Sequence, residues 1–251
     1  MSSILGFDIG GSSIKSAIVD TTSGRLTSEL SSIVPPSPLT SNDLISAIKN
    51  HAASLEWRGP VGVGYPGVLI RGEARSAAHV DASFIGFNLQ EALSRPFDQV
   101  SVINDADAAG LAEMAFGAGQ EHNRVDGGTV LLITLGTGIG SALFSGGRLF
   151  PNTEFGHMMI GDREAEEIAA ASVKTRDDLD FKEWTDQLNI VLREMHRLMT
   201  LDLIIIGGGV SENFGQFKDY IDVECPVKPA AMGPSAGVIG AALKTALDHK
   251  K

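Results

Sequence analysis

The sequence is poor in cysteine, in long apolar runs and in positive charge. A single cysteine among 251 residues excludes an internal disulfide and fits a reducing compartment such as the cytoplasm. The longest apolar run, at residues 201–210, is far too short to span a bilayer. No basic segment precedes the first apolar residues, so we expect no signal peptide.

The charge balance limits the class of partner. The sequence has 20 basic and 31 acidic residues, so its net charge is −11. This charge argues against a nucleic acid or an acidic membrane as the partner. A small anion can still bind, because local backbone N–H groups attract phosphate even in an acidic protein.

Glycine is abundant instead, with 29 residues, and it gathers at the ends of predicted strands. The stretches FDIGGSSIKSAIV (7–19) and ITLGTGIGSALF (133–144) both pass from an apolar strand through a Gly/Ser/Thr turn into a second strand. Residues 11–14 align with residues 136–139. We therefore expect a repeated structure, in which strands at 4–9, 15–20 and 25–33 recur at 130–135, 139–144 and 148–150.

Helices and single strands follow each of these three-strand meanders. Helices are predicted over residues 41–55, 104–119, 181–199 and 236–247, with two shorter ones capped by Asn88 and by Ser211. Buried strands are predicted over 61–65, 100–103 and 203–206. This order predicts an α/β protein of two related domains, residues 1–110 plus 233–251 and residues 111–232, facing a cleft.

The glycine turns do not fit the common nucleotide motifs. The Gly-Lys-Ser/Thr ending of a P-loop is absent, and the glycines at 136–140 run into a strand rather than the helix of a dinucleotide fold. The hairpin tips at 10–13 and 136–138, together with the triple glycine at 207–209, favour phosphate binding by backbone N–H groups and hydroxyls. The alternative is that tight hairpins require glycine for their geometry alone.

Two aspartates lie at predicted strand ends. Asp105 follows the strand at 100–103 beside Asn104, where a carboxylate can accept a proton from a sugar hydroxyl. Its alternative role is the N-cap of the next helix, although Asp107 also suits that helix start. Asp8 lies within an apolar strand and needs a partner, either a metal ion, a phosphate-bound water or a hydrogen-bonded turn.

The segment NTEFGH (152–157) contains a carboxylate and an imidazole three residues apart. Glu154 and His157 could hold a metal, but Gly156 separates them and no further Cys or His follows within reach, so we expect no zinc site. Binding of sugar hydroxyls fits better, and a structural histidine is the third option. The nearby acidic residues are interpreted as a solvated helix face: Asp162, Glu164, Glu166 and Glu167.

Taken in order along the chain, several stretches resemble the ROK sugar kinases (repressor, open reading frame, kinase) of the hexokinase–Hsp70–actin fold. Within that family they are most similar to the polyphosphate glucokinase branch. They span nearly the whole chain: FDIGGSSIK, VGVGYPGV, RSAAHVDASFIG, INDADAAGLAEMAFGAG, LGTGIGSALF, FPNTEFGH, LIIIGGGVS and AGVIGAAL.

The resemblance implies a role for each matching residue. Asp105 would be the catalytic base, and Asp8 would contact Mg²⁺ through a water molecule. No zinc site is expected, because the family's Cys-rich segment is missing. The sugar-binding residues would be Asn104, Glu154, His157 and Gly67. The phosphate- and nucleotide-binding residues would be Asp8, Gly10, Gly11, Ser12, Ser13, Lys15, Thr134, Gly136, Thr137, Gly138, Gly207, Gly208 and Gly209.

The implied activity is transfer of a phosphoryl group from polyphosphate, ATP or both to the 6-hydroxyl of glucose by a cytoplasmic homodimer. The alternatives are an ATP-only hexose kinase and a non-catalytic sugar-binding regulator. Two departures from the branch concern the donor: Ala82 stands where the branch has lysine, and Glu212-Asn213 stand where it tends to be basic. The cations that remain for polyphosphate are Lys15, Arg71, Arg75, Lys174 and Arg176.

Overall fold

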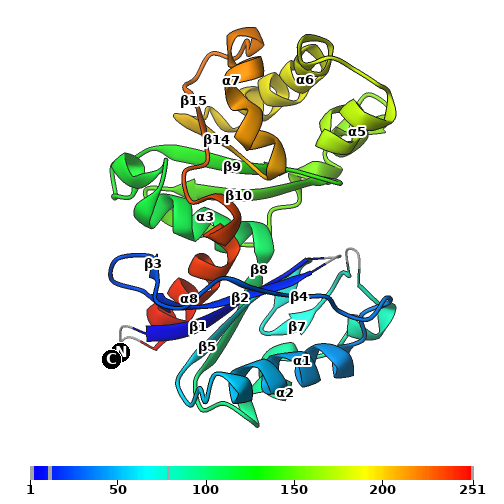
Figure 1. Ribbon diagram of the computed structural model, residues 1–251. Coiled ribbons are helices and arrows are strands. Elements are labelled where there is room, and N and C mark those ends of the chain that lie inside the picture. Colours follow the sequence, from blue (N-terminus) through cyan, green and yellow to red (C-terminus); the bar gives the residue numbers. More distant parts are fainter. Residues whose placement is uncertain (1–2, 11–12, 78–79, 250–251) are drawn as a thin grey trace. The chain divides into compact units, whose positions relative to one another are not determined.

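The computed structural model describes residues 3–10, 13–77 and 80–249. The chain forms two compact units, residues 1–112 with 235–251 and residues 113–234 (Figure 1). Each unit contains one main β-sheet with helices packed on it, which confirms the predicted α/β class. The expected domain boundaries lie two residues from these limits, and the independence of the two units as domains stays a prediction.

The sheet of the first unit has the strand order β3-β2-β1-β5-β8, and β4 also pairs with β2. Strand β1 is antiparallel to β2 and parallel to β5, which is parallel to β8. The carboxyl ends of β1, β5 and β8 therefore meet at one edge of the sheet. The strands are β1 (Ser3–Ile9), β2 (Ile14–Asp20), β3 (Arg25–Leu26), β4 (Ser31–Ile33), β5 (Val61–Tyr65) and β8 (Val100–Asn104).

The third predicted strand, residues 25–33, is wrong as a continuous element. It is divided into β3 and β4, because the hydroxyl of Ser28 accepts the hydrogen bond from the backbone N–H of Ile18 at 2.9 Å. A side chain thus takes the place of a backbone acceptor, and the ladder along β2 is interrupted at that point.

Helices cover both faces of this sheet (Figure 1). Helix α1 (Ser41–Ser54) begins after a capping box formed by Thr40 and Asp43, and it buries Leu44, Ile48 and Ala52 at helical spacing. These residues share a core with alternate residues of β1, such as Phe7. The short helix α2 (Leu89–Ser94) begins after Asn88, whose side chain accepts from the N–H of Glu91 as predicted.

The last helix, α8 (Ala236–Asp248), packs on β1, β5 and β8 and belongs to the first unit. The approach is close enough to require glycine. A Cβ atom on Gly62 would collide with the backbone of Ala241, and one on Gly240 would collide with the carbonyl of Ala108. Gly62 of β5 therefore allows α8 to lie close to the sheet, and Gly240 allows it to lie close to helix α3 (Asp105–Phe116).

The sheet of the second unit has the order β11-β10-β9-β14-β15. Strands β9, β10 and β11 form an antiparallel meander, and β14 and β15 add in parallel. This repeats the β1–β2 arrangement of the first unit, as the sequence predicts. The strands are β9 (Thr129–Leu135), β10 (Ile139–Ser145), β11 (Arg148–Phe150), β14 (Leu203–Gly207) and β15 (Val227–Pro229).

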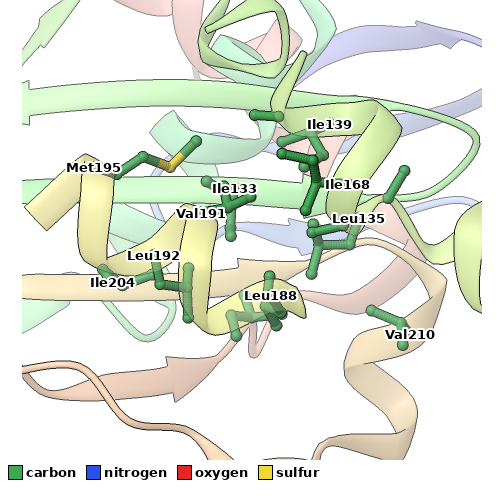
Figure 2. Close-up of a cluster of buried hydrophobic side chains, with 14 of the residues drawn as sticks. Ile133, Leu135, Ile139, Ile168, Leu188, Val191, Leu192, Met195, Ile204 and Val210 are labelled. Atoms are coloured by element: carbon green, nitrogen blue, oxygen red, sulfur yellow. The ribbon is translucent and has the colours of Figure 1, made fainter. Parts of the chain in front are cut away.

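Helix α6 (Phe181–Met199) provides the main apolar cover of this sheet. Its buried face, which includes Leu188, Val191, Leu192 and Met195, packs on side chains of the sheet such as Ile204 (Figure 2). The predicted bounds of this helix are confirmed. Truncation of one such core residue to alanine costs about 2–5 kcal/mol of folding free energy, so this face stabilises the strands that carry the second glycine tip.

The remaining elements are short. The predicted helix cap at Ser211 is wrong, because β14 leads into a 3-10 turn at Gly209–Asn213, and α7 (Phe214–Phe217) begins after Asn213.

Among the described residues, no helix is both long and apolar enough to cross a membrane. The other elements are β6 (Leu69–Ile70), β7 (Glu73–Ala74), α3 (Asp105–Phe116), β12 (Met159–Ile160), β13 (Arg163–Glu164), α4 (Ala165–Ala169) and α5 (Ala171–Arg176), with 3-10 turns at Ala82–Phe84, Gln120–His122, Phe155–His157, Lys218–Tyr220 and Gly233–Ser235.

Candidate active site

Two predicted site residues lie at the carboxyl edge of the first sheet. Asp8 of β1 is in register with Gly64 of β5, and Tyr65 of β5 is in register with Asn104 of β8. A Cβ atom on Gly64 would lie 3.6 Å from Asp8 Oδ1 and 3.7 Å from the Cα of Asp105. The sheet order therefore brings Asp8 and Asp105 to opposite sides of one glycine, although about a hundred residues separate them in sequence.

Asn104 supports the start of helix α3. Its side chain is 5% exposed, its Oδ1 accepts from the N–H of Asp107 at 2.9 Å, and its Nδ2 donates to the carbonyl of Gly67 at 3.2 Å. Asn104 is thus the N-cap, and the alternative role of Asp105 as the cap is wrong, because α3 begins at Asp105 itself. The half-buried carboxylate of Asp105 accepts from the N–H of Ala106 at 2.8 Å.

Gly67 contributes the shape of its backbone. Its φ angle of +148° disfavours other residues, and an added Cβ atom would lie 2.9 Å from both the carbonyl and the hydroxyl oxygen of Ser76. Ser76 also accepts from the N–H of Val68 at 2.9 Å and from the hydroxyl of Tyr65 at 3.0 Å. The turn that follows β5 is therefore held in one conformation beside Asn104.

Asp8 is half-buried, and burial raises its pKa, whereas the positive charge of Lys15 lowers it. Lys15 is the register partner of Asp8 on β2. Gly237, in the first turn of α8, packs directly against this carboxyl group, because an added Cβ atom would lie 2.5 Å from Asp8 Cγ. The sequence marks Gly237 only as part of a matching stretch and does not predict this contact.

The first glycine tip joins β1 to β2. Gly10 closes it by donating its N–H to the carbonyl of Ser13 at 2.9 Å. The predicted phosphate-binding residues Gly11 and Ser12 lie outside the described residues. Gly10, Ser13 and Lys15 are half-buried.

The second tip joins β9 to β10 and lies beside the triple glycine. Gly136 donates its N–H to the carbonyl of Gly138 at 3.0 Å, and both Gly136 and Thr137 are exposed. Thr134 is paired with Gly207 across the sheet. Gly208 has a φ of +80° and packs on the backbone of Leu135, so the two strand ends form one glycine-rich surface.

A serine that the sequence analysis missed holds this second tip. Ser172, in helix α5, donates its N–H to the carbonyl of Gly136 at 3.0 Å and its hydroxyl to the carbonyl of Thr137 at 2.7 Å. With two carbonyls of the tip occupied in this way, the tip has a defined conformation. No local motif marks Ser172, since it follows a run of alanines.

The turn that carries Glu154 and His157 is fixed by a buried serine of β10. The Ser141 hydroxyl donates to the carbonyl of Thr153 at 2.8 Å and accepts from the N–H of Phe155 at 3.1 Å. Thr153 in turn donates its hydroxyl to the carbonyl of Ser141 at 3.0 Å. These bonds place the turn against the start of β10, which is the strand that leaves the second tip.

The interpretation of the following acidic residues as a solvated helix face is wrong for Glu164 and Glu166. Glu164 Oε2 lies 2.9 Å from His157 Nδ1. Glu166 accepts from the N–H of Ile139 at 3.3 Å, and a Cβ atom on Gly138 would lie 2.5 Å from its Oε2. Glu166 thus joins the second tip to the Glu154–His157 turn, because helix α4 turns its first residues toward both.

The electrostatics of this turn follow from its carboxylates. The pKa of His157 is raised, chiefly by its hydrogen bond to Glu164, and the charges of Glu166 and Glu154 add to this. Partial burial raises the pKa of Glu154, with Glu166 adding and His157 opposing. Ligand atoms of His157, Glu164 and Glu166 lie within 4.8 Å of one another, a spacing that also suits a cation, so the expected lack of a zinc site stays a prediction.

Several cations expected to contact polyphosphate are paired with acids. Arg75 lies 3.2 Å from Glu73, and Arg176 makes two hydrogen bonds of 2.7 and 2.8 Å to Asp177. Lys174 lies over the ring of Phe181, 4.5 Å from its centroid. Pairing reduces what the two arginines can offer a polyanion.

The predicted site residues therefore form one group in each unit. The first unit brings together Asp8, Gly10, Ser13, Lys15, Gly67, Asn104 and Asp105. The second brings together Thr134, Gly136, Thr137, Gly138, Glu154, His157, Gly207, Gly208 and Gly209.

Comparisons with known proteins bear on these groups. A family model described as the ROK family matches residues 4–171. The polyphosphate glucokinase of Mycobacterium tuberculosis is 42% identical over 245 residues, which cover 97% of this chain and 91% of that protein.

Solved structures match over the whole length. The crystal structure of an inorganic polyphosphate/ATP-glucomannokinase from Arthrobacter sp. strain KM is 38% identical with a TM-score of 0.91, covering 99% of this chain and 100% of that chain. A ROK family glucokinase from Streptomyces griseus, solved with glucose and AMPPNP, shares the fold at 24% identity with a TM-score of 0.81, covering 98% of this chain and 99% of that chain. The expected actin-like ATPase fold is confirmed.

Proposed function

The chain belongs to the ROK family, and we propose that it is a sugar kinase that transfers a phosphoryl group from polyphosphate or ATP to the 6-hydroxyl of glucose. The observation that carries the proposal is the edge of the first sheet, where Asp8 and Asp105 flank Gly64. Identity over nearly the full length to a protein named polyphosphate glucokinase supports the choice of acceptor and donor.

Asp105 is the proposed catalytic base. Its carboxylate accepts the proton of the 6-hydroxyl as that oxygen attacks the terminal phosphorus, and the bond from that phosphorus to the bridging oxygen of the donor breaks. Asn104 keeps Asp105 at the first position of α3 by capping the helix. Because Asn104 also donates to the carbonyl of Gly67, one side chain links the start of α3 to the turn beside it.

The donor phosphates are assigned to the glycine tips and the triple glycine. One set of proposed phosphate contacts comes from Gly10, Gly11, Ser12, Ser13 and Lys15. The other set comes from Thr134, Gly136, Thr137, Gly138 and Gly207 to Gly209. Backbone N–H groups and hydroxyls stabilise the charge of phosphoryl oxygens, and small residues let these oxygens approach the chain.

Asp8 fits a role beside Mg²⁺. A half-buried carboxyl group with a raised pKa gains from a nearby cation, and Asp8 lies at the same sheet edge as the base. We assign Asp8 to Mg²⁺ through a water molecule. When bound, Mg²⁺ neutralises charge on the phosphoryl oxygens.

The sugar is assigned to Glu154, His157, Asn104 and Gly67. A carboxylate accepts hydrogen bonds and a protonated imidazole donates them, so Glu154 and His157 together match two hydroxyls of a ring. A cytoplasmic homodimer completes the proposal. The single cysteine supports the compartment, and light scattering of the purified protein tests the dimer.

A coupled assay for glucose 6-phosphate with ATP, GTP or nucleotide-free long-chain polyphosphate tests the function. We expect turnover with ATP and with polyphosphate. Affinity for polyphosphate should be weak because Arg75 and Arg176 are paired with acids, and its rate should fall at high salt because the remaining contacts are electrostatic. Turnover with ATP alone would leave an ATP-dependent hexose kinase. Glucose binding by calorimetry without turnover from any donor would instead support the sugar-binding regulator.

A further inference from the structure

The imidazole of His157 lies between two carboxylates. Its Nδ1 is 2.9 Å from Glu164 Oε2, and its Nε2 is 3.9 Å from Glu154 Oε2. The side chains of His157, Glu164 and Glu154 are 57%, 38% and 39% exposed, so a ligand from solvent can reach the ring. Of these two carboxylates, only that of Glu164 is at hydrogen-bond distance from the imidazole of His157.

We propose that Glu164 is a positioning residue, which holds Nδ1–H of His157 and thereby directs Nε2 toward the sugar beside Glu154. The inference rests on the proposed function, in which His157 contacts the sugar. A histidine ring can turn about its side-chain bonds and can carry its proton on either nitrogen. A carboxylate that accepts from one ring nitrogen fixes both the orientation of the ring and the nitrogen that carries the proton, as it does for histidines that bind metals.

The backbone of a short hairpin places Glu164 beside the His157 ring. Strands β12 and β13 form a short hairpin in which Met159 is the register partner of Glu164, and the hairpin turns at Gly161, whose φ is +68°. At its base, the N–H of Ala165 donates to the carbonyl of Met158 at 2.9 Å. The chain thus returns after His157 so that Glu164 faces the ring from the start of α4.

The Glu164 main chain is held as well. Its N–H donates to Glu167 Oε2 at 3.0 Å, which ties the residue to the first turn of α4. Glu166, one residue from Glu167, contacts the second tip through Ile139. The position of Glu164 is therefore determined by a hairpin and by a helix start, and the carboxylate is pre-organised before the sugar arrives.

The charges around the ring support the same assignment. The carboxylates that face His157 are Glu154 from the preceding turn, Glu164 from the end of β13 and Glu166 from α4, and all three favour the protonated ring. A protonated ring held at Nδ1 has only Nε2–H left for the ligand. Glu154 then accepts from one hydroxyl while His157 donates to a neighbouring oxygen, so Glu164 helps to select a sugar with this pattern.

Steady-state kinetics of Glu164→Gln, Glu164→Asp and the matched control Asp162→Asn test the proposal. Asp162 is exposed in the same hairpin turn. We expect Glu164→Gln to raise KM for glucose about 10-fold while kcat and KM for ATP change little, because lost outer contacts typically cost 10- to 100-fold in affinity or activity. Glu164→Asp should recover part of the affinity, and Asp162→Asn should match the wild type.

A second readout separates positioning from general structure. Nitrogen NMR of labelled histidine, recorded at a pH where the ring is neutral, should show the proton of His157 on Nδ1 in the wild type and a loss of that preference in Glu164→Gln. Equal changes in KM for glucose and for ATP, an unchanged Nδ1 signal, or a stoichiometric metal ion lost only in Glu164→Gln would each overturn the proposal. Wild-type protein without any sugar kinase activity would overturn the proposed function instead, and the NMR comparison would still test the contact.

Discussion

The two glycine tips join similar pairs of antiparallel strands but have different neighbours. In the first, Ile9 pairs with Ile14, with four residues between them in the sequence, whereas in the second Leu135 pairs with Ile139, with three residues between them. In both, the first glycine donates its N–H to the carbonyl of the last turn residue. The two hairpins therefore share this closing hydrogen bond and differ by one residue in the length of the connecting segment.

The neighbours of the two tips differ in chemistry. Beside the first tip, the sheet edge supplies the carboxylates of Asp8 and Asp105. The second tip is held by Ser172 and Glu166, and Glu166 links it to the turn with Glu154 and His157. In the proposed function both tips bind donor phosphates, and their different neighbours add the proposed base in the first unit and the proposed sugar contacts in the second.

The largest expected effect is at the sheet edge of the first unit. Asp105→Asn removes the proposed base while keeping a side chain of the same shape at the start of α3. We expect kcat to fall by about 10²- to 10⁴-fold with little change in thermal stability, because general-base catalysis is typically worth that much. Asp98→Asn, at an exposed position of the same unit, is the control and should keep full activity. Near-normal turnover by Asp105→Asn would remove the residue from the mechanism.

A smaller effect is expected where α8 contacts Asp8. In Gly237→Ala the new methyl group would lie within 2.5 Å of the Asp8 carboxyl carbon, so the helix or the carboxylate has to shift. Overpacking of this kind costs about 1–3 kcal/mol, measurable as a lower free energy of unfolding in urea together with reduced turnover. Gly215→Ala is the matched control, because its Cβ atom meets nothing within 4 Å. Equal stability of the two variants would contradict the close packing described.

The second tip offers a milder test of the comparison. Ser172→Ala keeps the backbone bond to Gly136 but removes the hydroxyl bond to Thr137. A neutral hydrogen bond contributes about 0.5–1.5 kcal/mol, so we expect KM for the phosphoryl donor to rise about 2- to 10-fold with KM for glucose unchanged. Thr175→Ala, exposed in the same short helix, controls for changes in α5. A selective effect on glucose would show that the serine does not act through the phosphate tip.

The smallest effect is the pH dependence of sugar binding at the second unit. The pKa of His157 is raised, chiefly by its hydrogen bond to Glu164, so its protonated form persists to a higher pH than usual and is lost as the pH rises through the raised value. The pKa of Glu154 is raised above 4.5, so its charge is lost earlier than usual as the pH falls. Glucose affinity should therefore be highest between the two pKa values, and calorimetry across pH checks this. A high-pH decline that persists in His157→Gln would assign the titration to another group.

Much of the architecture could be predicted, because local patterns are sufficient for it. The alternating apolar residues and glycine turns predict both meanders, and the helical spacing in Phe181–Met199 predicts α6 with its bounds. The division of residues 25–33 into two strands could not be predicted, since it depends on the hydroxyl of Ser28 reaching Ile18 across the sheet. The cap of α3 could not be predicted either: the sequence offers Asp105 as an alternative cap, whereas Asn104 takes that position, and both residue types suit it.

The sequence by itself determined which residues could carry chemistry: the two tips, Asp8, Asn104, Asp105 and the Glu154–His157 pair all follow from residue type and local position. Only the tertiary structure decided which of them meet, because neighbours in a sheet are set by strand order and not by distance along the chain. The order β1-β5-β8 places Asp8 and Asp105 around Gly64, and the β12–β13 hairpin returns Glu164 to His157. An acidic stretch that suggests a solvated face in the sequence thus becomes part of the candidate site through hydrogen bonds that no local pattern specifies.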